Sequence, residues 1–530
     1  MAEAAFSLSA LRRRGSSALA RRGSSAAPSW LVLPLVAVAL LAALPLAYVA
    51  WQAAAVGWAG SAALLFRPFT AALLASTLEL AAAVTLGSVL VGTAAAWLVE
   101  RSDLPGRSVW RVLVPLPLAM PALVSAFAWL SLTPRVEGMA GAVLVLVLAE
   151  YPLVYLPVAA ALRGMDPALE DVARSVGHGP WRIFGRTVLP QLVPALSGGV
   201  LLVTLHMLVE FGPLALLRVE TFTTAIYEAY ELSYDGAAAA MLSAVLIALC
   251  LCVMAAELLL RGRRRFSRAA SGAIAAHAPA RLGHATLPAF AGLAALLGLA
   301  LGLPVAMLAY WLLLARRAAL PLDRILSAVG DSVQLAALGA VLTTAVGLSL
   351  VLAAFRRRGR MAVLAERLPF VVHALPGLVV ALALVYFCLR VAPVLYQTTA
   401  LLLVAYALLF LPLAQTALRP AVEQVPPAME EVALALGRAP WRVLLTVTLP
   451  NILPGLSAAT LLVFMQLMKE LTATLVLAPT GVRTLAMELW AQSSQMKYGT
   501  AAPYAALLVL VSGAPAYWAT VELQKRRGRR

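Results

Sequence analysis

Apolar runs long enough to cross a lipid bilayer recur along this chain, and they limit its fold more than any other feature. A helix needs about 20 apolar residues to cross the ~30 Å hydrocarbon core. Hydrophobic residues make up 62% of the 530 residues, and charged residues make up only 12%. The strand-like alternation of a membrane barrel is missing. The sequence therefore predicts an all-α polytopic membrane protein.

We expect about twelve transmembrane helices in two sets of six. The first set covers residues 30–51, 73–99, 110–133, 139–161, 190–211 and 237–260. The second set covers residues 287–314, 333–355, 368–390, 398–418, 450–475 and 501–521. The run that begins at residue 30 is too long for a cleaved signal peptide, so we interpret it as a retained first span.

Arginine residues cluster beside these apolar runs, at residues 12–14, 21–22, 261–265, 356–360 and 526–530. Such clusters mark the cytoplasmic side of membrane proteins. Both termini and the 261–286 segment are therefore expected in the cytoplasm, which agrees with an even number of spans. The clusters also account for the net charge of +17 without nucleic acid binding. One predicted outer loop, residues 316–324, is basic and departs from the rule.

The chain repeats itself at a fixed offset of 260 residues. Residues 168–196 read ALEDVARSVGHGPWRIFGRTVLPQLVPAL, and residues 428–456 read AMEEVALALGRAPWRVLLTVTLPNILPGL. The same offset pairs Glu210 with Glu470 and Thr224 with Thr484. Similarity at one offset marks duplicated structure. We therefore divide the chain into a basic tail (1–29), a first half (30–260), a polar linker (261–286), a second half (287–522) and a second basic tail (523–530).

Each repeated segment is expected to form a short helix, a glycine turn and a second helix. Pro167 and Pro427 suit helix starts, and Gly177 and Gly437 suit helix ends. Four acidic residues fall in the first turns, near the positive end of the helix dipole: Glu170, Asp171, Glu430 and Glu431. The second helices lead through Leu189–Pro190 and Leu449–Pro450 into the next spans. Two such elements suit docking of two identical partner subunits.

The pattern of an acidic pair, Ala, Gly and Leu-Pro resembles the signature loop of binding-protein-dependent ABC importer permeases. The resemblance implies a fused, two-half type I permease whose two loops carry the coupling helices that contact the ATPase. The residues concerned are Glu170, Asp171, Ala173, Gly177, Leu189 and Pro190, and again Glu430, Glu431, Ala433, Gly437, Leu449 and Pro450. Both copies carry Asp or Glu followed by Val where the commonest form of the loop has two alanines.

Further segments resemble fused ferric-iron permeases, so iron import is the expected function. They are ERSDLPGR at residues 100–107, VEFGPLALLRVETFTTAIYEAY at 209–230 and MKELTATLVLAPTGVRTLAMELW at 468–490. Thiamine and phosphonate permeases share the fused layout, so these solutes remain alternatives. A secondary transporter is a further alternative, because such carriers also have twelve spans in two halves.

The chain lacks the sequence of an ATP-binding loop. Its lysines are Lys469, Lys497 and Lys525, and none of them follows a glycine, so a G-x-x-x-x-G-K-[ST] loop is excluded. We expect a translocation subunit that is not an enzyme and binds no cofactor or resident metal. The resemblance implies that ATP and Mg²⁺ bind two copies of a separate ATPase, and that a periplasmic or lipid-anchored solute-binding protein delivers the solute. The expected location is the prokaryotic inner membrane.

Ionisable residues inside spans are candidates for the translocation path, because burying a charge in lipid is costly. Glu79 lies within a predicted span, and a shifted alignment places Gln334 opposite it. Glu210 and Glu470 are expected near the outer ends of their spans, where oxygen ligands suit a hard cation. The alternative is that each glutamate pairs with a neighbour such as Lys469. His206 and His373 are more simply explained by interhelical hydrogen bonding.

Overall fold

The computed structural model describes residues 32–165, 168–261, 280–315, 321–356, 363–364, 367 and 375–528. Within these ranges, nine helices are long and apolar enough to cross a membrane, or ten if one bent pair counts as a span. Two shorter apolar helices, Gly377–Val391 and Tyr498–Gly513, accompany them. Each of the twelve predicted spans overlaps one of these segments, so the all-α polytopic prediction is confirmed.

The first half contains six principal helical segments. They are α2 (Val32–Leu65), α3 (Pro68–Arg101), the pair α4 (Arg107–Leu113) and α5 (Ala122–Leu132), α6 (Met139–Gly164), α9 (Leu189–Val209) and α12 (Gly236–Arg261). Shorter helices lie between them: α7 (Ala168–Ser175), α8 (Pro180–Ile183), α10 (Gly212–Leu216) and α11 (Phe222–Tyr227).

The second half follows the same order. Its principal segments are α13 (Thr286–Leu297) with α14 (Leu303–Ala315), α15 (Leu322–Arg356), α17 (Gly377–Val391), α18 (Thr399–Glu423), α21 (Leu449–Leu467) and α24 (Tyr498–Gly528). The shorter helices are α19 (Pro427–Ala435), α20 (Pro440–Val443), α22 (Thr472–Leu477) and α23 (Leu485–Ser494). Helix for helix, the order repeats that of the first half.

Packing within the two halves is equivalent. Helix α3 packs against α6 and α9, and α15 packs against α18 and α21 in the same way. Gly92 of α3 lies so close to α6 that an added Cβ would be 3.0 Å from the Tyr155 nitrogen, and Gly347 of α15 meets Ala414 and Gln415 of α18. These two glycines are 255 residues apart, which supports the shifted alignment that pairs Glu79 with Gln334. Small residues allow such close helix approach in membranes.

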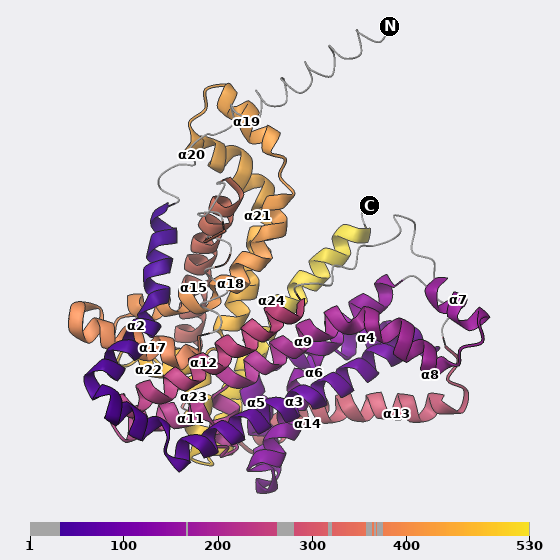
Figure 1. Ribbon diagram of the computed structural model, residues 1–530, viewed down its shortest axis with the longest axis horizontal. Coiled ribbons are helices and arrows are strands. Elements are labelled where there is room, and N and C mark those ends of the chain that lie inside the picture. The colour runs from indigo at the N-terminus through magenta and orange to yellow at the C-terminus, as the bar shows by residue number, and fades with distance from the viewer. Residues whose placement is uncertain are drawn as a thin grey trace.

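The first helix of each half crosses to the other half. Helix α2 packs against α12 of its own half and against α17 of the second half. Helix α14 packs against α24 of its own half and against α5 of the first half. Arg390 of α17 strengthens the α2 contact, because its guanidinium lies 6.0 Å from the Trp51 ring centre. The two halves are therefore interlocked near the middle of the molecule and diverge elsewhere (Figure 1).

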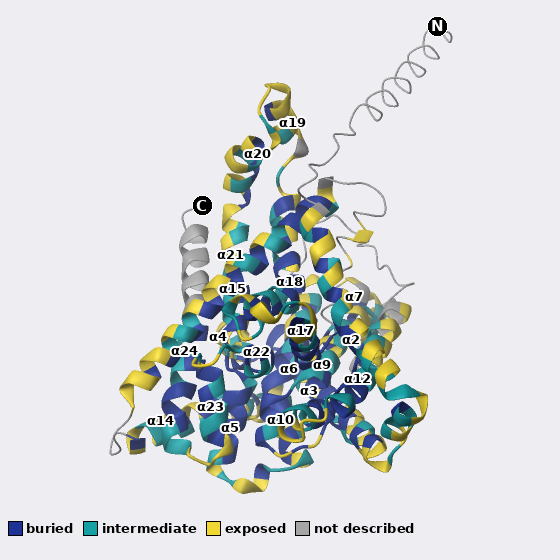
Figure 2. Cartoon of the chain, turned by 90° about the vertical axis from the view of Figure 1, so that its left-hand side faces the viewer, coloured by how far each residue is buried: buried dark blue, intermediate teal, exposed yellow. Residues whose placement is uncertain are grey.

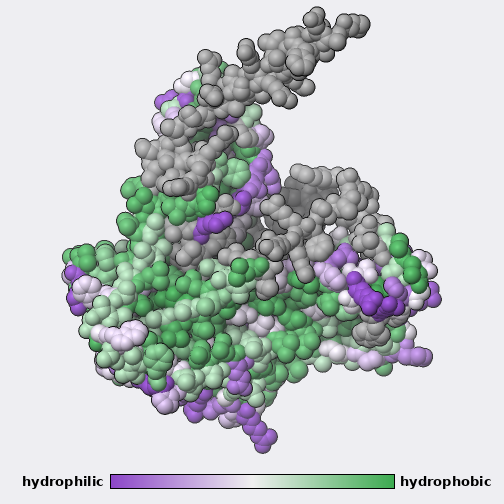
Figure 3. Space-filling view, viewed as in Figure 1, coloured by the Kyte–Doolittle hydropathy of each residue, from purple (hydrophilic) through white to green (hydrophobic). Residues whose placement is uncertain are grey.

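Hydrophobic side chains cover much of the face seen in Figure 3, and hydrophilic ones gather at its margins. This distribution fits helices surrounded by lipid, since exposed apolar residues such as Leu86 and Leu90 of α3 are 61% and 62% accessible. A soluble protein would not expose an apolar surface of this extent. The hydropathy of the surface thus agrees with the membrane assignment.

Several sequence-based boundaries need correction. The predicted span 110–133 is a helix pair bent by 87°, because Pro115, Pro117 and Pro121 interrupt it. The span predicted at 450–475 ends at Leu467, and a separate helix begins at Thr472. Arg324, predicted in a loop, lies within α15, and residues 316–320 lie outside the described residues. Most of the 261–286 linker and residues 368–374 of one predicted span also lie outside them.

The close contact at Gly92 gives a test of the packing. We expect Gly92→Val to lower the stability of the detergent-solubilised protein by about 1–3 kcal/mol, because overpacking would separate α3 from α6. Gly330→Val on α15 is the matched control, since an added Cβ there meets no atom within 4 Å. Thermal unfolding followed by the fluorescence of a thiol-reactive dye would compare the two. Equal stability of both variants would contradict the close-packing role.

Candidate functional site: two paired surface elements and a cavity between the halves

Helices α7 and α19 begin the two repeated surface elements, and both end as predicted. Gly177 and Gly437 have φ angles of 83° and 79°, in the left-handed region that glycine adopts without strain. In each copy the N–H of the residue after the glycine donates to the carbonyl five residues earlier. His178 donates to Ala173, and Arg438 donates to Ala433. This pattern is the Schellman end of a helix, and it explains why an alanine and a glycine recur at this spacing.

The second helix of each element continues into a long helix through one wide turn. Residues 184–188 and 444–448 form π-helical turns immediately before α9 and α21. Pro190 and Pro450 follow these turns at the starts of α9 and α21, and each lacks an N–H for the preceding turn. Single π-turns of this kind occur inside α-helices, often at functional sites. Leu189–Pro190 and Leu449–Pro450 therefore stand where each surface element continues directly into the helix that follows.

Apolar side chains on both short helices face outward. The side chains of Val172 and Val176 on the first element are 62% and 70% exposed. Those of Val432 and Leu436 at the matching positions are 60% and 76% exposed. The two elements lie at the ends of separate helix bundles, with α19 at the top of Figure 1 and α7 at its right. Figure 2 shows that α19 and α20 are largely exposed.

The four acidic residues of these elements have different environments. Glu170 is buried and its Oε1 lies 3.0 Å from Nη1 of Arg101, so it faces the body of the protein. Asp171 is exposed and pairs with Arg174 at 3.0 Å. Glu430 accepts a hydrogen bond from the Thr448 hydroxyl. Glu431 is exposed. It is expected in the first turn of α19, but it lies just beyond that turn.

A cavity of about 290 Å³ lies where the two halves meet. Four breaks between helices line it: those between α4 and α5, before α17, between α9 and α10, and between α21 and α22. Glu210 and Glu470 occupy the last two breaks, so the predicted equivalence of these residues is seen in the structure. A threonine hydroxyl from a later helix donates to each glutamate carbonyl: Thr223 of α11 to Glu210, and Thr474 of α22 to Glu470.

The cavity also contains ionisable residues that the sequence analysis did not assign to a path. Glu150 of α6 has only 4% of its side chain exposed, and its Oε2 lies 2.9 Å from Nδ1 of His206. The other ring nitrogen of His206 lies 3.3 Å from Oε2 of Glu210, so the imidazole bridges two carboxylates. Lys469 lines the cavity from the second half. Glu150 lies within a predicted span, so the rule that selected Glu79 could also have selected it.

The cavity is more acidic on the side of the first half. At the 260-residue offset, Phe410 and Gln466 stand where the first half has Glu150 and His206. Lys469 does not pair with Glu470, as considered from sequence; its Nζ lies 3.4 Å from the Leu118 carbonyl. Glu470 instead accepts the Ala473 N–H at the start of α22.

Glu79 and Gln334 do not line this cavity; their side chains are exposed on α3 and α15. His373 lies outside the described residues. In the part of the chain that the structure covers, no three His, Cys, Asp or Glu side chains form a group that could hold a metal ion. The bridged carboxylates thus form a cavity lining of mixed charge in this conformation.

One pairing inferred from sequence is wrong. Thr221 and Thr484 are the N-cap residues of α11 and α23, so Thr484 corresponds to Thr221 and not to Thr224. The helix starts confirm this correspondence, because the Phe222 N–H donates to Thr77 of α3 and the Leu485 N–H donates to Ser332 of α15. The 260-residue offset holds as far as Glu470, after which the second half has three more residues.

Comparison with known proteins agrees with the duplicated architecture. The family described as "Binding-protein-dependent transport system inner membrane component" matches the chain twice, at residues 88–266 and 345–528. Each match includes one repeated surface element and the helices around it. The internal repeat therefore corresponds to two copies of one family unit.

Individual relatives extend the comparison. The chain is 43% identical over 494 residues to the Fe(3+)-transport system permease protein FbpB 2 of Haemophilus influenzae, covering 92% of this chain and 97% of the relative. It is 27% identical over 233 residues to the sulfate transport system permease protein CysT of Escherichia coli, covering 40% and 83%. It is 29% identical over 153 residues to the molybdenum transport system permease protein ModB of Escherichia coli, covering 26% and 66%. The chain therefore belongs to the family of inner membrane components of binding-protein-dependent transport systems.

Proposed function

We propose that this chain is a membrane-spanning subunit of an ATP-driven importer for ferric iron. The observation that carries the proposal is the identity of 43% with an Fe(3+)-transport permease across nearly the whole of both chains. The sulfate and molybdenum permeases match only part of the chain and at lower identity. The relative that matches both halves of this chain is thus a permease of an Fe(3+)-transport system.

The two exposed apolar elements supply the proposed ATPase contacts. Val172 and Val176 protrude from one element, and Val432 and Leu436 protrude from the other. Because the elements repeat the same helix, glycine turn and π-turn, they suit two copies of one ATPase subunit, with ATP and Mg²⁺ bound there. A solute-binding protein delivers the cargo on the opposite side. This arrangement requires both elements, both termini and the 261–286 linker to lie in the cytoplasm of a prokaryotic cell, as the arginine clusters indicate.

The cavity between the halves supplies the proposed path. Glu150, Glu210 and Glu470 present carboxylate oxygens, which suit a hard trivalent cation. His206 and Lys469 place basic side chains beside these carboxylates. A path must bind its ion strongly enough for entry and weakly enough for release. The mixture of acidic and basic groups fits that requirement better than an all-acidic site.

The direct test is uptake of radioactive iron by cells that express this chain together with its ATPase and binding protein. We expect uptake to require all three proteins and ATP. Unchanged iron uptake after deletion of this gene, with loss of sulfate, molybdate, thiamine or phosphonate uptake instead, would reject iron as the cargo. Uptake by the purified chain alone in liposomes would reject ATP-driven import and favour a secondary transporter.

The glycine turns allow a test of docking. We expect Gly437→Val, and likewise Gly177→Val, to lower uptake at least about tenfold while the protein still inserts, because valine resists a positive φ angle and would misplace the short helix. Gly437→Asn is the matched control, since asparagine tolerates this conformation. Co-purification with the ATPase measures docking directly. Full ATPase association and uptake by both valine variants would refute the role of these elements.

The cavity glutamates allow a test of the path. We expect Glu210→Gln and Glu470→Gln each to lower iron uptake roughly tenfold, which corresponds to about 1.4 kcal/mol of lost cation binding. Glu423→Gln, which removes an exposed carboxylate at the end of α18, is the control. Immunoblots of membranes would show that all variants are present in equal amounts. Wild-type uptake by the double variant Glu210→Gln/Glu470→Gln would return both residues to a purely structural role.

A further inference from the structure

The last turn of α3 and the residues after it, 100–103, contact several separate parts of the molecule, and we call them the α3 hub. Its first residue, Glu100, has a side chain that is fully buried. Arg111 of α4 donates to Glu100 at 2.8 Å, and Arg163 at the end of α6 donates to its other oxygen. Glu100 thereby fixes the ends of three helices relative to one another.

The second residue of the hub holds the first surface element. The side chain of Arg101 is 4% exposed, and its ion pair with Glu170 of α7 is 3.0 Å long. Across the described residues, the three guanidinium nitrogens of Arg101 make no hydrogen bond, so the ion pair with Glu170 is its main electrostatic support. A buried charge with so few partners depends strongly on the position of its counter-ion.

The hub also contacts the segment that enters the second half. The Ala280 N–H donates to the Arg101 carbonyl at 2.8 Å, and the Asp103 N–H donates to the Ala280 carbonyl at 3.0 Å. The Leu282 N–H donates to the Asp103 carboxylate at 2.9 Å. The helical stretch that becomes α13 begins immediately afterwards, at Gly283. Movement of the hub would therefore reach both halves.

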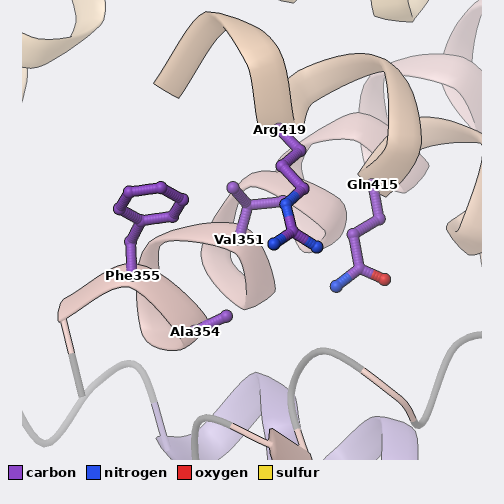
Figure 4. Close-up of a pocket in the computed structure, with 5 residues that line it drawn as sticks. All are labelled: Val351, Ala354, Phe355, Gln415 and Arg419. Atoms are coloured by element: carbon purple, nitrogen blue, oxygen red, sulfur yellow. The ribbon is translucent and has the colours of Figure 1, made fainter. Parts of the chain in front are cut away.

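The second half is built differently at the equivalent place. The 255-residue offset puts Phe355 at the position of Glu100, so the carboxylate is replaced by an aromatic ring. A cavity of about 260 Å³ lies there, lined by Val351, Ala354, Phe355, Gln415 and Arg419. Figure 4 shows Gln415 and Arg419 reaching from α18 towards the α15 residues. In addition, Thr448 donates to Glu430, whereas the first half has Val188 at that position.

We propose that the Arg101–Glu170 ion pair transmits movement of the first surface element to α3, with Arg101 acting as a positioning residue for coupled transport. This rests on the proposed function, because it requires an ATPase docked on α7. Helix α3 packs along α6, which carries Glu150, and along α9, which carries His206 and ends beside Glu210. A displacement of α7 passed through a buried ion pair would thus shift the helices that line the central cavity. Because the second half has a different arrangement at the position equivalent to the hub, we assign this coupling contact to the first half.

The test measures transport and ATP hydrolysis together in reconstituted complexes supplied with loaded binding protein. We expect Arg101→Gln to assemble with the ATPase but to lower the number of solute molecules transported per ATP by at least about fivefold. Arg101→Lys should retain most of the coupling, because an ammonium can still pair with Glu170. The double variant Arg101→Gln/Glu170→Gln should remain uncoupled although it leaves no unpaired buried charge, so poor folding would not account for its defect.

Glu423→Gln is the control, since it breaks an exposed ion pair with Arg419 at 2.8 Å and lies outside the hub. A normal transport-to-ATP ratio in the double variant would overturn the proposal. The proposal would also be overturned if the transport defect of Arg101→Gln were fully explained by a smaller amount of assembled complex. Failure of the wild-type chain to bind an ATPase would instead refute the proposed function, and the two results are distinguishable because assembly is measured first.

Discussion

Inside a bilayer, every break in a helix leaves backbone groups that only the protein can satisfy, and this constraint organises the molecule. The breaks after α9 and α21 are closed by Thr223 and Thr474, whose hydroxyls donate to the carbonyls of Glu210 and Glu470. The starts of α11 and α23 are satisfied by Thr77 and by Ser332. Irregular backbone at membrane depth is tolerated where it is buried or lines a cavity, and here the breaks surround the central cavity.

The duplicated helices set up an approximate symmetry that the side chains then break. Gly92 and Gly347 each lie where equivalent helices approach closely, so the two halves share one framework. Within that framework, the first half supplies Glu150 and His206 to the cavity and the second half supplies Gln466 and Lys469. A symmetric scaffold can thus carry an asymmetric charge distribution without any change in helix packing.

The two surface elements likewise share one backbone framework but differ in their side-chain contacts. Both copies end in a Schellman turn and continue through a π-turn, so both present apolar side chains in the same way. Their first-turn glutamates are held differently, by Arg101 of α3 in one half and with the help of Thr448 in the other. Two chemically similar surface elements are therefore anchored to the body of the protein in different ways.

The sequence by itself determined the membrane class, the order and approximate positions of the helices, the duplication and the two glycine turns. These features depend on local properties: the length of an apolar run, the missing N–H of proline and the freedom of Gly177 and Gly437 at positive φ. Only the tertiary structure decided that Glu150 meets His206 and that Arg101 holds Glu170. Such contacts join residues far apart in the chain. Which residues meet depends on how the helices pack, and no single segment records that arrangement.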